Sequence, residues 1–179
     1  GYPTDVIEVY DTIIEYAQRG TILVDMTTSS PTLAIDLYHM AKQKGLFMLD
    51  APVTGGDVGA NKGTLSIMVG GDEAIFHKVL PLFKLMGTTL TYMGEAGSGM
   101  HAKLANQTAI AGSIIGICEA LTYAKEKNLD LNKMLSVIVG GSASSWQAAN
   151  NGPKMIKKDY APGFFVKHYL KDLKLVLEE

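Results

Sequence analysis

One lysine and two amides lie close together in a segment that is otherwise apolar or small. Lys103, Asn106 and Gln107 are three and four residues apart, so on a helix they project from one face. Burial among apolar neighbours would lower the pKa of the amine from about 10.4, which suits a group that must accept and donate a proton. We predict a half-buried general acid/base at Lys103. The alternative is a lysine that extends into solvent from a helix end.

A hydroxyl residue followed by two glycines comes after a short apolar segment. Thr54, Gly55 and Gly56 could direct backbone N–H groups and one hydroxyl toward an anion, because residues without a Cβ allow close approach of the chain. Such a loop could hold an anion, a carboxylate or a phosphate. A simple turn explains the same residues equally well.

Helical and strand-like segments alternate in the first half of the chain. Amphipathic helical periodicity and short apolar runs follow one another with brief links, which indicates parallel strands with helices on their faces. Such sheets bind ligands at the ends of their strands, where Thr28 and the 54–56 loop lie. We predict an α/β domain over residues 1–96.

The remaining residues show a helical pattern throughout. A long helix is predicted over 97–127, with Ser98 at its start as a side chain able to cap the first backbone donors. Residues 109–118 are apolar or small on every side, which predicts a central helix covered all round. We predict an all-α domain over 97–179, built on this helix.

Composition limits the classes of partner. A net charge of −2 and a pI near 6.1 give no electrostatic basis for binding nucleic acid or an anionic membrane. The apolar run at 109–118 is shorter than the roughly 20 residues of a membrane span. The single cysteine, Cys118, is expected in the core and favours a reducing, cytoplasmic location. The four histidines lack the spacing of a metal site, so no metal is predicted.

Three motifs, in order along the chain, resemble the β-hydroxyacid dehydrogenase family, which includes 3-hydroxyisobutyrate dehydrogenase and tartronate semialdehyde (2-hydroxy-3-oxopropionate) reductase. 6-Phosphogluconate dehydrogenase is a more distant relative. The motifs are Asp50-Ala-Pro-Val-Thr-Gly-Gly56, Gly97-Ser-Gly99 leading to Lys103-Leu-Ala-Asn106-Gln107, and Lys171-Asp172-Leu173. The resemblance implies the C-terminal part of a Rossmann-type NAD(P)-binding domain followed by an all-α domain, with NAD or NADP as cofactor.

The resemblance also implies roles for individual residues. It makes Lys103 the catalytic lysine of hydride transfer between nicotinamide and a small β-hydroxyacid or its semialdehyde. It implies a homodimer or higher homo-oligomer. The residues that it places at the substrate are Thr54, Gly55, Gly56, Asn106 and Gln107, and those at the cofactor are Tyr2, Pro3, Thr28 and Lys171. For Lys171, an exposed position on an amphipathic helix is an equal alternative.

Other features depart from the family pattern. The glycine-rich G-x-G-x-x-G turn and the residue that selects NAD or NADP are absent. So are the family's terminal helices beyond Lys171. We expect a fragment of a longer enzyme, without both ends and inactive alone. The alternatives are a non-catalytic helical dimerisation module and an imine reductase.

Overall fold

The computed structural model describes all residues from 1 to 179. The chain forms two compact units. The first unit comprises Gly1–Ala105 together with Gly163–Glu179, and the second unit comprises Asn106–Pro162. The predicted division into domains 1–96 and 97–179 stays a prediction.

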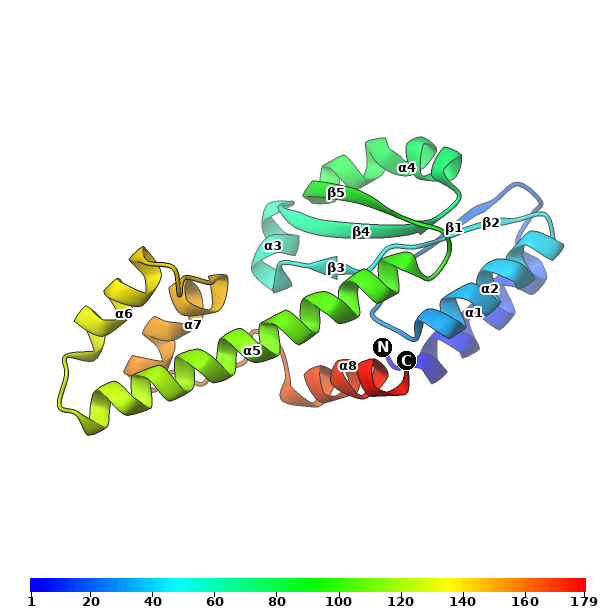
Figure 1. Ribbon diagram of the computed structural model, residues 1–179. Coiled ribbons are helices and arrows are strands. Elements are labelled where there is room, and N and C mark those ends of the chain that lie inside the picture. The colour runs from blue at the N-terminus through cyan, green and yellow to red at the C-terminus, as the bar shows by residue number, and fades with distance from the viewer. The chain divides into compact units, whose positions relative to one another are not determined.

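All five strands belong to one mixed sheet in the first unit (Figure 1). The strands lie in the order β1-β2-β4-β3, and β5 pairs with β4. β1 and β2 are parallel, as are β4 and β5, whereas β4 is antiparallel to β2 and β3. The strands are β1 (Ile22–Asp25), β2 (Phe47–Asp50), β3 (Val53–Thr54), β4 (Leu65–Gly71) and β5 (Gly87–Gly94).

The antiparallel direction of β4 differs from the expected parallel strands. β3 and the short helix α3 (Gly56–Lys62) connect β2 to β4. A right-handed crossover between parallel strands usually contains a full helix, and α3 has only 7 residues. The chain therefore returns in the opposite direction after Gly63, which has a left-handed backbone conformation with φ of 64°.

Helices cover both faces of this sheet (Figure 1). α1 (Pro3–Tyr16) and α2 (Pro31–Gln43) pack on one face, where Met48 of β2 is buried. α4 (Glu73–Met86) packs on the other face, where the next residue of β2, Leu49, is buried. Successive side chains of a strand point to opposite faces, so a short strand can contribute to both cores.

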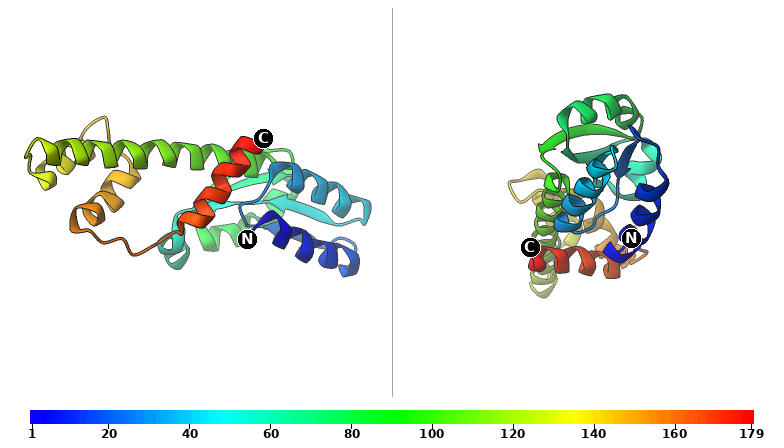
Figure 2. Two further views of the ribbon diagram at one scale, coloured as in Figure 1. Left: turned by 90° about the horizontal axis from the view of Figure 1, so that it is seen from below. Right: turned by 90° about the vertical axis from the view of Figure 1, so that its right-hand side faces the viewer.

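Two further helices complete the first unit. α5 (Ser98–Glu126) begins in it and continues into the second unit. α8 (Val166–Glu178) belongs to the first unit and passes close to the start of α1 (Figure 2). The Glu179 carboxylate after α8 accepts a hydrogen bond of 3.2 Å from the Thr32 hydroxyl near the start of α2.

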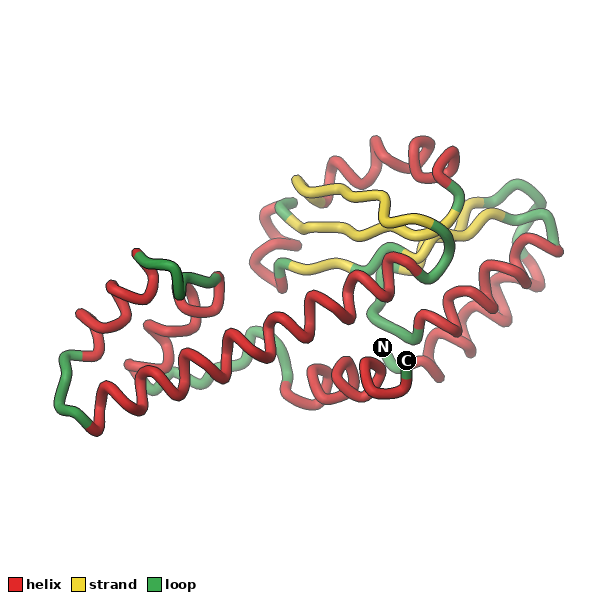
Figure 3. The backbone as a smooth tube through the Cα atoms, viewed as in Figure 1, coloured by secondary structure: helices red, strands yellow, loops and turns green.

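The second unit is entirely helical (Figure 3). It contains the rest of α5 with α6 (Leu131–Gly140) and α7 (Trp146–Lys157). Asp130 caps α6 by accepting hydrogen bonds from the next backbone N–H groups in the helix. The core of this unit consists of Ile117, Leu121, Leu135, Ile138 and Ala148.

The prediction that the middle of α5 is covered on every side is wrong for this chain. Ile115 is 57% exposed, and Cys118 is also exposed rather than in the core. One face of α5, with Ile117 and Leu121, packs in the core of the second unit, and the opposite face has no such partner. By length and hydropathy α5 could cross a membrane, but one such helix is weak evidence because core helices of soluble proteins pass the same test.

Candidate active site

Lys103 lies on the second turn of α5 and is only 6% exposed. Burial lowers the pKa of its amine to about 8. The charge of Asp172 on α8 acts against this effect and raises the pKa, and the charge of Lys171 lowers it. The predicted burial of this lysine is confirmed, and the amine can carry or release a proton near neutral pH.

A carboxylate that is distant in the sequence binds the start of α5. Asp50, the last residue of β2, accepts a hydrogen bond at Oδ1 from the Gly97 N–H and another at Oδ2 from the Met100 N–H, both of 2.8 Å. The first N–H groups of a helix have no acceptor within the helix. We expected the Ser98 side chain to cap them, but Ser98 is already helical and the carboxylate of Asp50 accepts from the Met100 N–H.

Glycines allow this helix start to press against the sheet. A Cβ on Gly99 would lie 2.5 Å from the carbonyl oxygen of Met68 in β4. A Cβ on Gly70 would lie 2.5 Å from Oδ1 of Asp50. Both distances are shorter than any ordinary carbon contact, so only glycine fits at these positions.

The predicted carboxylate loop lies at the end of β3. Thr54 ends this strand, and Gly55 and Gly56 have φ of 131° and 63°, conformations that favour glycine. α3 begins at Gly56, and the nearby carboxylate of Asp57 accepts a 2.9 Å hydrogen bond from the Val58 N–H. These angles fit both an anion-binding loop and a simple turn, so the carboxylate site stays a prediction.

This loop and Lys103 are connected through β4. The Pro52 carbonyl, two residues before Thr54, accepts a 3.1 Å hydrogen bond from the Met68 N–H. The carbonyl of the same Met68 contacts Gly99, which is one helical turn before Lys103. The loop and the lysine are thus attached to one short segment of the sheet.

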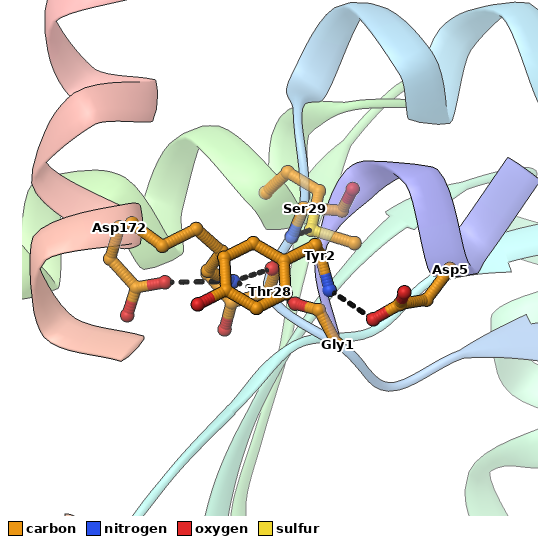
Figure 4. A network of polar contacts seen from close by, with 8 residues as sticks. Gly1, Tyr2, Asp5, Thr28, Ser29 and Asp172 are labelled. Carbon is orange, nitrogen blue, oxygen red and sulfur yellow. Dashed lines mark hydrogen bonds and ion pairs between the residues drawn. The ribbon is translucent and has the colours of Figure 1, made fainter. Parts of the chain in front are cut away.

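Three of the predicted cofactor residues line one cavity of about 390 Å³ in the first unit. Tyr2 and Pro3 form one side of it, and Lys171 of α8 forms part of the other. The Lys171 ammonium donates hydrogen bonds to the carbonyl oxygens of Thr28 and Gly1, and pairs with Asp172 at 3.0 Å (Figure 4). All four predicted cofactor residues are therefore in one place, and Lys171 is not the exposed lysine of the alternative.

Two hydroxyls near this cavity were not selected from the sequence. Thr27 Oγ1 and Ser29 Oγ are buried and have no hydrogen-bond partner, although the Ser29 N–H contacts the sulfur of Met100 at 3.4 Å. A buried polar atom without a partner is costly, and a polar ligand would supply the missing bond. The loop after β1 therefore fits the polar groups of a nicotinamide cofactor. The hydroxyl-rich run from Thr27 to Ser30 was the available signal.

Asn106 and Gln107 follow on α5, in the second unit. The Asn106 amide donates a 3.1 Å hydrogen bond to the Gln107 side-chain oxygen. The structure contains no group of three or more His, Cys, Asp or Glu side chains arranged to hold a metal ion.

Comparison with sequence families gives a match over each part of the chain. Residues 1–94 match the family described as the NAD binding domain of 6-phosphogluconate dehydrogenase. Residues 97–179 match the family described as "NAD-binding of NADP-dependent 3-hydroxyisobutyrate dehydrogenase".

Individual proteins are similar over most or all of the chain. An uncharacterised oxidoreductase of Bacillus subtilis (strain 168) is 50% identical over 100% of this chain and 63% of its own length. The 2-hydroxy-3-oxopropionate reductase of Escherichia coli (strain K12) is 42% identical over 89% of this chain and 55% of its own length.

A solved structure of Mycobacterium tuberculosis 3-hydroxyisobutyrate dehydrogenase with L-serine has a TM-score of 0.90 and 32% identity. It covers 99% of this chain, and this chain spans 63% of it.

Proposed function

Because this chain belongs to the β-hydroxyacid dehydrogenase family, we propose that it supplies the proton-transfer and carboxylate-binding groups of an NAD(P)-dependent enzyme. The substrates of that enzyme are small β-hydroxyacids or their semialdehydes. The observation that carries this proposal is the buried amine of Lys103, whose pKa is about 8.

Lys103 acts as general base in oxidation and general acid in reduction. In oxidation its neutral amine takes the proton of the substrate hydroxyl while the C–H bond releases hydride, and a carbonyl forms. The chemistry that a nicotinamide cofactor would supply is acceptance of this hydride in oxidation and its donation in reduction. In reduction the Lys103 ammonium protonates the carbonyl oxygen, so the amine returns to its starting form. A pKa near 8 makes both forms available.

The loop of Thr54, Gly55 and Gly56 holds the substrate carboxylate. Its positive φ angles support this role, since successive backbone N–H groups in such a conformation can point toward one anion. A carboxylate fixed there leaves the hydroxyl carbon a few bonds away, which restricts the enzyme to short acids. Asn106 and Gln107 are proposed as further ligands of the substrate oxygens, on the resemblance alone.

Residues around the cavity beside α8 would hold part of NAD or NADP. Tyr2 and Pro3 would contact the cofactor, and the bonds of Lys171 to the loop of Thr28 hold the two sides of the cavity together. The free hydroxyls of Thr27 and Ser29 would bind polar groups of the cofactor. A homo-oligomeric state and a cytoplasmic location stay predictions.

The test is a variant of Lys103 in the protein expressed from the complete open reading frame. We expect Lys103→Ala to lower kcat by roughly 10²- to 10⁴-fold, the usual contribution of a general acid/base, without loss of cofactor binding. Activity is measured with 3-hydroxyisobutyrate, tartronate semialdehyde and L-serine, each with both cofactors. The matched control is Lys125→Ala, an exposed lysine on the last turn of the same helix. Full activity of Lys103→Ala would refute the proposal.

A further inference from the structure

We propose that Asp50 is a positioning residue for the general acid/base. By holding the backbone N–H groups of Gly97 and Met100, its carboxylate fixes the residue at which α5 begins and so sets the place of Lys103. This inference rests on the proposed function, because it assigns to Asp50 a role in catalysis that acts entirely through Lys103.

Both oxygens of the Asp50 carboxylate accept hydrogen bonds from the start of α5. The Asp50 side chain is 3% exposed, and each of its two oxygens accepts one strong hydrogen bond, from Gly97 and from Met100. Charged acceptors of this kind bind more tightly than neutral ones, and a helix N-terminus favours negative charge. Two bonds to amides three residues apart define both the height and the rotation of the first turn.

Ionisation of Asp50 has a cost in the folded state. Burial raises the pKa of Asp50, and the N–H groups of Gly97 and Met100 only partly oppose that effect. An acid whose pKa is raised on folding is less favourable in its ionised form in the folded state than in the unfolded state. Stability is therefore lost as the pH rises through the pKa of this carboxyl group.

Close packing leaves the helix start no room to move. Gly99 meets the Met68 carbonyl and the Asp50 backbone oxygen at distances that exclude a Cβ, and Gly70 meets the Asp50 carboxylate in the same way. A displacement of α5 along its axis would break a hydrogen bond or produce a clash. The anchor therefore has one well-defined position.

The position of Lys103 follows from the position of this helix start. Lys103 lies three residues after Met100 and four after Gly99, on the same side of the helix, and it is buried like them. A slip of one residue would rotate its side chain by roughly 100° and shift it by about 1.5 Å. A misplacement of about 1 Å can cost roughly 100-fold in rate, so the anchor has a direct catalytic consequence.

Asp50 also begins the chain segment that leads to the carboxylate loop. Thr54 is four residues further on, a span of at most ~14 Å even when fully extended. One buried side chain thus connects the start of the substrate loop with the start of the helix that carries the acid/base.

The variant Asp50→Asn tests this role in the protein expressed from the complete open reading frame. The Asn side chain has one acceptor oxygen and one NH2 group, which is a donor. Either the Gly97 or the Met100 N–H group would therefore lose its acceptor and lie against the NH2 group. We expect kcat to fall roughly 10- to 100-fold, with KM for the nicotinamide cofactor unchanged. We also expect the pKa of Lys103 to rise from about 8, because a loosened helix start exposes the amine to water.

The Lys103 pKa is measured by NMR titration of ¹³C-methylated lysines, with Lys103→Ala to assign the signal. The charged groups that face Lys103 are Asp172 and Lys171 of α8, and both are retained in the variant. The matched control is Asp130→Asn, which changes a capping carboxylate at the start of α6 in the same way. This control should lower stability without altering kcat or the Lys103 pKa.

The outcomes separate this inference from the proposed function. If Lys103→Ala is inactive while Asp50→Asn keeps the wild-type kcat and Lys103 pKa, Asp50 has only a structural role and the inference is wrong. If Lys103→Ala remains active, the proposed function itself fails.

If Asp50→Asn does not fold, the inference is tested by measuring amide hydrogen exchange in the unaltered protein. The anchor requires the Gly97 and Met100 amides to exchange at least about 100-fold more slowly than free amides, and rapid exchange would overturn it.

Discussion

At the scale of single residues, the buried charges form a small network around the proposed acid/base. Lys103, Lys171 and Asp172 are all largely buried, and two of them form a 3.0 Å ion pair. Burial lowers the pKa of Lys103, and the carboxylate of Asp172 limits the fall. The working pH of the enzyme is therefore expected to depend on a residue that need not touch the substrate.

Replacement of Asp172 tests this dependence. In Asp172→Asn the opposing negative charge is lost, so the pKa of Lys103 should fall below its value of about 8. Oxidation needs the neutral amine, and its pH–rate profile should then reach its plateau at lower pH than in the wild type. Asp36→Asn removes an exposed carboxylate on α2 and serves as control. A profile of Asp172→Asn that is unchanged or moves to higher pH would contradict the network.

At the scale of elements, the sequence predicted the features that depend on local residue patterns, such as the extent of a helix. The long helix was correctly expected because good helix formers follow Ser98 for about seven turns without a proline. The capping of this helix by Asp50 was not predicted. Asp50 lies 47 residues before Gly97 and 50 before Met100, and no periodicity in the sequence connects them. The burial of Lys103 could be predicted from its apolar neighbours. The free hydroxyls of Thr27 and Ser29 became visible only once the fold showed them without partners.

Two glycines of α5 should respond to substitution in opposite ways. Gly99→Ala places a Cβ against backbone oxygens and should reduce the free energy of unfolding by about 1–3 kcal/mol. Gly112→Ala, on the same helix, meets no atom within 4 Å and should increase it by about 0.5–1 kcal/mol through helix propensity. Urea denaturation measures both. Equal effects would show that the start of α5 is not packed as described.

At the scale of the whole molecule, the matched families and the compact units divide the chain at different places. The family matches end at residue 94 and begin again at 97, whereas the compact units divide within α5. A single long helix belongs to both units, so a change in sequence pattern and a change in packing need not coincide. The exposure of Ile115 and Cys118 was not predicted either. Apolar composition shows that a helix face can be buried, but it does not show which element covers that face.

Cofactor binding can be tested independently of catalysis. We expect Ser29→Ala, which removes a buried hydroxyl without a partner, to raise the Kd for NAD or NADP several-fold and leave stability nearly unchanged. Fluorescence titration of the protein from the complete open reading frame measures this change. Ser136→Ala, at an exposed position on α6, is the matched control. Tighter or unchanged binding by Ser29→Ala would exclude that hydroxyl as a ligand.

The titration of Lys103 in the unaltered protein tests the central claim most directly. Its amine should titrate with a midpoint near 8, because burial disfavours the charged form more than Asp172 restores it. Oxidation of the hydroxyacid should rise with pH through the same midpoint. A midpoint above about 10, the value of a lysine in water, would mean that the amine is solvated and would contradict its assignment as the general acid/base.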